Sequence, residues 1–236
     1  MSDDQNKWTV YARSAYLKIQ HLQDNVVYPL ANSWKVNYSS LYEANDARVY
    51  WFIGLARLLN NFKLAYIAIY QMGDTRWWQA VSKESNETNI KDWIREFEVY
   101  VTWAYVHALC TITEETFRRL SVARGDIETG SLKSKYDKLL KDTNLLQYLP
   151  LFDLFRLIRN TAHNNGIYLP ETQKDEIVLW NGKSYSFKVG YGLDFVNSEF
   201  IINVLTKDLA KAMNELMTHS KIITLPAVSR RVKVTP

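Results

Sequence analysis

One stretch of the chain carries four polar side chains at spacings that place them on one side of a helix. They are Arg156, Arg159, Asn160 and His163, and at about 100° per residue they fall within a sector of about 100°. The opposite side of the same helix is apolar and carries Leu151, Leu154, Phe155, Ile158 and Ala162. A cationic face of this kind indicates an anionic partner.

This face has the groups needed to bind and cleave a phosphodiester. Arg159 and His163 lie one helical turn apart, so both can address the same bound group. A guanidinium offers forked donors to a phosphate, and an imidazole can exchange the proton of a ribose 2′-hydroxyl that attacks its own phosphate. Asn160 can donate to a phosphate oxygen, and Arg156 can extend the contact along the ligand. Such a reaction needs no metal ion.

The Arg159-Asn160-x-x-His163 string resembles the signature of the HEPN family (higher eukaryotes and prokaryotes nucleotide-binding). Members are all-helical domains, and many are metal-independent RNases that work as dimers. The resemblance covers mainly residues 90–166. It implies an endoribonuclease of a toxin or antiviral defence system, with RNA as substrate, a homodimer as assembly, and an antitoxin or another protein as a further partner. It implies neither a cofactor nor a metal.

Two arginines compete for the role of the motif arginine. In the similar family four to six residues separate the arginine from the histidine, and a polar residue often follows the arginine. Three residues separate Arg159 from His163, whereas six separate Arg156 from it. We prefer Arg159 because Asn160 follows it, while Leu157 follows Arg156; the spacing alone favours Arg156.

The same residues also fit a purely structural interpretation. Arginine and histidine near a helix C-terminus complement the helix dipole, and Asn164-Asn165-Gly166 is typical of a helix end. On that interpretation the chain is a non-catalytic helical scaffold that binds a protein partner or a nucleotide. Adjacent arginines disfavour protonation of His163 and the helix C-terminus favours it, and the sequence leaves the outcome open.

Other candidate residues lie on the preceding helix. His107 and Cys110 are three residues apart, but the chain has no second His/Cys pair, so we expect them in the core and predict no metal site. An acidic partner for the arginines is expected among the glutamates of this helix, although each fits a solvated surface. These glutamates are Glu96, Glu98, Glu114 and Glu115.

The elements that position these residues are long helices, because only 8 Gly and 5 Pro interrupt the chain. A capping-box pattern from Ser40 to Glu43 predicts a helix start there. Asn181-Gly182 favours a type I′ turn, so we predict one small β-hairpin near 176–189 in an otherwise all-α, HEPN-like helical bundle. The predicted helices span about 4–31, 40–73, 90–122, 131–142, 150–163 and 195–218.

Size and charge restrict the function classes. With 236 residues and 47% apolar content, the chain fits one helical domain over 1–228 and a basic C-terminal tail over 229–236. Three positive charges of the net +4 lie in that tail, so the body is close to neutral. A general DNA coat protein is therefore disfavoured, and any contact with a polyanion has to be local.

Cysteine content and hydropathy indicate the compartment. The single cysteine, Cys110, cannot form an internal disulfide, and the first residues lack the pattern of a signal peptide. The uncharged run from Val99 to Thr113 is shorter than the roughly 20 residues of a membrane span. We therefore expect a soluble, cytoplasmic protein without membrane association.

Overall fold

Helices dominate the computed structural model, which describes residues 3–83, 86–126 and 130–228. The described strands form a single two-stranded sheet, so the predicted all-α class with one small hairpin is confirmed. The predicted basic tail over 229–236 lies outside the described residues.

The first helical segment is longer than predicted. It comprises α1 (Asp3–Leu22), a π-helical stretch η1 (Gln23–Val27) and α2 (Tyr28–Asn37). Pro29, near the end of the predicted range 4–31, lies in the first turn of α2. Proline is tolerated in a first turn because its missing N–H has no partner there.

The second predicted helix is interrupted, and its predicted capping box is wrong. A short helix α3 (Ser39–Glu43) has no side-chain cap, and α4 (Ala47–Met72) begins after a turn in which Asn45 has a positive φ of 55°. Asp46 caps α4 by accepting the backbone N–H of Arg48 at 2.9 Å. A further short helix, α5 (Thr75–Val81), follows.

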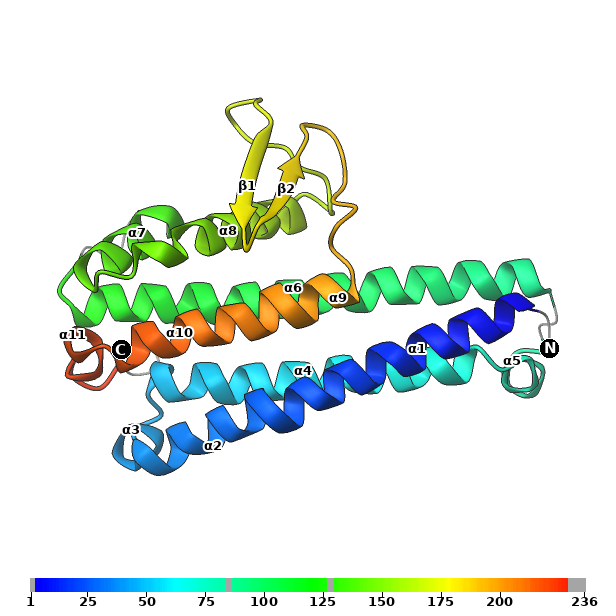
Figure 1. Cartoon of the computed structure of the whole chain (residues 1–236), viewed down its shortest axis with the longest axis horizontal. Helices are drawn as coiled ribbons and strands as arrows, with labels where there is room; N and C mark the ends of the chain where they lie inside the picture. Colours follow the sequence, from blue (N-terminus) through cyan, green and yellow to red (C-terminus); the bar gives the residue numbers. More distant parts are fainter. Residues whose placement is uncertain (1–2, 84–85, 127–129, 229–236) are drawn as a thin grey trace, which may run out of the picture.

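Helix α4 is the central element of the bundle. It packs against α1 and against α6 (Glu87–Ala123), and Figure 1 shows it running alongside both. By length and composition α4 is also the one helix of the described residues that could cross a membrane, with 44% of its most apolar window buried in the protein. A core helix of a soluble protein has the same properties, so the absence of membrane association stays a prediction.

The candidate residues lie on a helical layer beside α6. It consists of α7 (Leu132–Asp142), the 3-10 turn η2 (Leu146–Tyr148) and α8 (Leu149–His163), and α8 packs on both α6 and α7. Helix α8 ends as predicted: Asn165 and Gly166 have φ angles of 55° and 83°, and the Gly166 N–H donates to the carbonyl of Thr161.

The hairpin projects from the α8 side of the bundle (Figure 1). Strands β1 (Glu176–Trp180) and β2 (Lys183–Phe187) are antiparallel, and the predicted Asn181-Gly182 turn has two positive φ angles, 48° and 73°. Trp180 fixes the hairpin to the last helical segment by donating from Nε1 to Asp208 at 2.7 Å. That segment comprises α9 (Ser198–Phe200), the π-helical η3 (Ile201–Asp208), α10 (Leu209–Thr218) and α11 (Ser220–Ile223).

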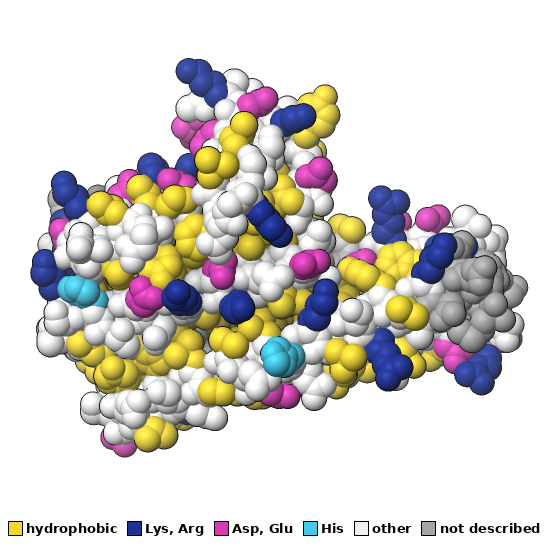
Figure 2. Space-filling model, viewed as in Figure 1, with side chains coloured by type: hydrophobic (Ala, Val, Ile, Leu, Met, Phe, Trp, Pro, Cys, Tyr) yellow, Lys and Arg dark blue, Asp and Glu magenta, His cyan; other side chains and the backbone are white. Residues whose placement is uncertain are grey.

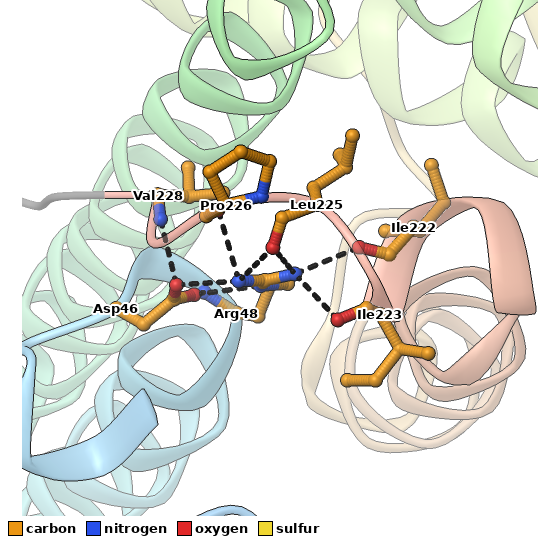
Figure 3. A network of polar contacts seen from close by, with 7 residues as sticks. All are labelled: Asp46, Arg48, Ile222, Ile223, Leu225, Pro226 and Val228. Atoms are coloured by element: carbon orange, nitrogen blue, oxygen red, sulfur yellow. Dashed lines mark hydrogen bonds and ion pairs between the residues drawn. The ribbon is translucent and has the colours of Figure 1, made fainter. Parts of the chain in front are cut away.

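A buried ion pair fastens the end of the described chain to the start of α4 (Figure 3). Asp46 and Arg48 have fully buried side chains with Nη2 and Oδ2 2.7 Å apart, and Asp46 also accepts the N–H of Val228 at 2.7 Å. The remaining guanidinium donors point to backbone carbonyls of Ile222, Ile223, Leu225 and Pro226. The pair is thereby satisfied on all sides, as a buried charge requires.

Candidate functional site

The polar face of α8 lines a groove of about 740 Å³. All four predicted residues, Arg156, Arg159, Asn160 and His163, border it. Its other walls are α6, the start of α7, the segment 168–172 and the first residue of β1. The structure therefore brings the predicted residues together around one concave, solvent-accessible site.

Arg159 is held by a carboxylate from α6. Its Nε and Nη2 lie 3.0 and 2.9 Å from Oε2 of Glu114, and its Nη1 donates to Oδ1 of Asn160 at 3.2 Å. Arg118 binds the other oxygen of Glu114 at 2.7 Å. Since 28% of the Arg159 side chain is exposed, the guanidinium is oriented but still reaches the groove.

Glu114 is ionised between these two arginines. Burial raises the pKa of its carboxyl, but the hydrogen bond from Arg118 and the charge of Arg159 outweigh burial and hold the pKa below its ordinary value. A single carboxylate thus binds two guanidiniums, which leaves a net positive charge at this end of the groove.

His163 is exposed at the last turn of α8. Partial desolvation of the ring, the charge of Arg159 and the charge of His107 lower the pKa of His163, while Glu114 opposes them. Desolvation, with the neighbouring positive charges, therefore outweighs the opposing charge of Glu114 and lowers the pKa of His163. The imidazole is neutral near pH 7 and can accept a proton.

The prediction that His107 is a core residue is wrong. Its ring is exposed, and its Nε2 donates to the carbonyl of Ala162 at 3.1 Å, because a carbonyl can only accept. The rings of His107 and His163 meet edge to face with their centroids 5.6 Å apart. Cys110 is buried as expected, and burial raises the pKa of its thiol to about 12.

Arg156 faces the hairpin end of the groove. Its Nη2 lies 3.5 Å from Oε2 of Glu176 in β1, and its Nε lies 3.5 Å from Oδ1 of Asp153. Asp153 also accepts from Tyr136 and from Lys133. Arg156 thus joins α8, α7 and the hairpin, whereas Arg159 is the arginine whose charge acts on His163.

The groove is only weakly basic. Four cationic side chains and three carboxylates line it, namely Arg118, Lys133, Arg156 and Arg159 against Glu114, Glu171 and Glu176. On the face shown in Figure 2, the basic and acidic side chains of the described residues are interspersed. This agrees with the expectation that any polyanion contact is local.

A stripe on α6 completes the site: Glu114, one of the four glutamates expected as a possible acidic partner, binds Arg159, whereas the position of His107 was not expected. His107 and Glu114 are seven residues apart, as are Thr111 and Arg118, and seven residues make about two helical turns. This spacing puts His107, Glu114 and Arg118 on the side of α6 that meets α8. The periodicity could have identified His107 and Glu114, whose neighbours Tyr105, Val106 and Leu109 are buried on the other side.

No family model, curated protein or solved structure matches the chain. Within the described ranges, no three His, Cys, Asp or Glu side chains are grouped so that they could hold a metal ion. The resemblance to HEPN domains therefore stays a prediction that rests on residues of α8.

Proposed function

We propose that the chain is a HEPN-like, metal-independent endoribonuclease that cleaves RNA at the groove beside α8. One observation carries the proposal: His163 is an exposed imidazole with a lowered pKa, one turn from an arginine that is oriented but still accessible. A general base works best when it is neutral at the operating pH and lies beside the group that binds the substrate.

Each residue has a role in the proposed reaction. Neutral His163 removes the proton of the 2′-hydroxyl, and the oxygen attacks the adjacent phosphorus. The bonds of Arg159 to Glu114 use Nε and Nη2, and one N–H of Nη1 donates to Asn160, so the second N–H of Nη1 can donate to the phosphate. Arg156, at the other end of the groove, contacts the RNA backbone. The products are a 2′,3′-cyclic phosphate and a 5′-hydroxyl.

The biological setting follows from the resemblance. A cytoplasmic toxin or antiviral RNase, active as a homodimer and restrained by an antitoxin or another protein, is the setting we propose. Light scattering at working concentration measures the assembly, and the homodimer predicts twice the mass of the 27.6 kDa chain.

One observation favours a second candidate function. Glu114 already neutralises part of the charge of Arg159, as a structural ion pair between two helices would. On this alternative the chain is a non-catalytic scaffold, and the same residues bind a protein partner or a nucleotide in the groove but catalyse no reaction.

RNA cleavage separates the two functions. Wild type and His163→Ala are incubated with total RNA in EDTA, with His21→Ala as a matched control, because His21 is an exposed histidine of α1 that does not border the groove. The proposal predicts degradation by wild type and by His21→Ala but not by His163→Ala. Equal products from all three proteins contradict the role of His163, and no products from folded wild type support the scaffold.

A further inference from the structure

His163, which borders the groove, contacts a second imidazole from a different helix. His107 of α6 and His163 of α8 are 56 residues apart in the chain, yet their rings contact each other at an interplanar angle of 88°. Both rings are exposed. Nε2 of His107 donates to the carbonyl of Ala162, the residue before His163, and this hydrogen bond fixes the ring of His107. The contact is therefore part of the packing of α6 against α8.

At this separation the charge of one ring acts on the other, and a charge on His107 lowers the pKa of His163. Two imidazolium charges with centroids 5.6 Å apart repel each other, so the second proton binds less readily than the first. Arg159 adds a positive charge on the His163 side, and Glu114 of α6, which binds Arg159, provides the compensating negative charge. Over an interval of pH the pair then holds one proton.

We propose that His107 and His163 form one acid–base pair that shares a single proton, so that each protomer carries both groups that RNA cleavage requires. Arg159 disfavours a charge on His163, which leaves the shared proton to His107. Because Nε2 of His107 stays bound to Ala162, the exchangeable proton is on its Nδ1. The catalytic part of this inference rests on the proposed function, whereas the shared proton does not.

The proton balance of the reaction closes within the pair. Neutral His163 takes the 2′-hydroxyl proton as the O2′–P bond forms, and His107 gives its Nδ1 proton to the O5′ atom as the P–O5′ bond breaks. The electron pair of the broken bond stays on O5′, which becomes a 5′-hydroxyl. The pair begins and ends with one proton, which has moved from His107 to His163, and exchange with water restores the starting state.

The pair changes what the homodimer has to supply. With His163 as the only histidine beside the arginines, the partner subunit of a homodimer would have to bring the second proton-transfer group. His107 provides that group from the same chain. A homodimer can still enclose the RNA, but its second His163 is not needed for the proton transfers.

Titration of the imidazoles by NMR tests the shared proton without any RNA. In wild type, the signals of His163 are expected to respond in two steps, because the neighbouring ring is charged over part of the pH range. In His107→Gln, whose amide can still donate to Ala162, His163 is expected to titrate in one step with a higher pKa, because a nearby positive charge is lost. An identical single-step titration of His163 in both proteins overturns the shared proton.

Two substrates test the catalytic role. With an RNA oligonucleotide, His107→Gln is expected to lose about a hundredfold or more in rate. With a ribonucleoside 3′-aryl phosphate, whose leaving group departs without a proton, the loss should shrink by about tenfold or more. If His107 has only a structural role, His107→Gln loses the same factor in rate with both substrates, and this result overturns the assignment of His107 as the acid.

The outcomes separate this inference from the proposed function. If wild type and His107→Gln cleave RNA equally while His163→Ala does not, the function stands and the pair is wrong. If the NMR titrations are coupled but wild type cleaves no RNA, the shared proton stands and the catalytic role falls with the proposed function.

Discussion

Arg159 and Glu114 lie 45 residues apart in the sequence and form an ion pair across the contact of α8 with α6, with Nη2 and Oε2 2.9 Å apart. Helix α6 thereby orients the guanidinium that borders the groove. Both charges act on His163, Arg159 against its protonation and Glu114 in favour of it. The ion pair is thus a structural link and also an electrostatic control on the proposed base.

Replacing either member of this pair should shift the pKa of His163 in a direction set by the charge that is removed. Arg159→Ala removes a cation, so the pKa of His163 should rise, and Glu114→Gln removes an anion, so it should fall. NMR titration of the imidazole measures both shifts. Shifts of the same sign in both variants contradict this electrostatic account.

The Glu114 ion pair should also stabilise the fold in a pH-dependent way. Its folded-state pKa is lowered, so its contribution is present above the unfolded pKa of about 4.3 and is lost as pH falls through the folded value. The difference in free energy of unfolding between wild type and Glu114→Gln, measured in urea, should therefore shrink from pH 7 to pH 3. A difference that is constant over this range means that the carboxylate charge contributes nothing.

Arg156 and Arg159 should differ in what their removal affects. Arg159→Ala should lower the cleavage rate about a hundredfold, since it loses a charge-assisted contact to the phosphate, and it should also lower Tm because it breaks the ion pair with Glu114. Arg156→Ala should mainly lower Tm, because its contacts with Asp153 and Glu176 join α8 to the hairpin.

Kinetics and thermal denaturation of both variants, with exposed Arg76→Ala as control, check this distinction. A larger loss of rate in Arg156→Ala at unchanged Tm shows that the six-residue spacing is the right one and that Arg159 is not the motif arginine.

The buried pair of Asp46 and Arg48 should be essential to stability. Arg48→Met leaves the Asp46 carboxylate buried without its charge partner, which typically costs about 3–5 kcal/mol. Urea unfolding measures the loss, and Arg76→Met, which breaks an exposed pair with Asp74, should leave the free energy of unfolding nearly unchanged. A loss for Arg48→Met no larger than that of the control contradicts the role of the pair.

Local signals in the sequence were enough to predict the helices and the hairpin. Asn181-Gly182 determines its turn through two positive φ angles, and Asn164 to Gly166 ends α8 in the same local way. The cap of α4 was misassigned because Ser40 to Glu43 and Asp46 both fit a helix start. The tertiary contacts of Asp46 with Val228 and of Arg48 with the carbonyl of Ile222 favour the second site, and residues near Asp46 in sequence do not reveal them.

The candidate site was predicted most fully where it lies on one helix, whereas Glu114 of α6 was expected only as one of four possible acidic partners. The face of α8 follows from a 3.6-residue period, and its four residues do line one groove. His107 and Glu114 come from α6, and their roles depend on which side of α6 meets α8. The buried residues around His107 suggested a core position, but the helical period turns its side chain to the opposite side.

The central claim is that His163 cleaves RNA without a metal ion, and the most direct measurement is the chemistry of the RNA ends. A defined oligonucleotide is incubated in EDTA with wild type, His163→Ala and His21→Ala, and the products are identified by mass spectrometry. The account predicts 2′,3′-cyclic phosphate and 5′-hydroxyl ends from wild type and His21→Ala, and intact RNA with folded His163→Ala. Cleavage by His163→Ala at the wild-type rate, or intact RNA with all three proteins, contradicts it.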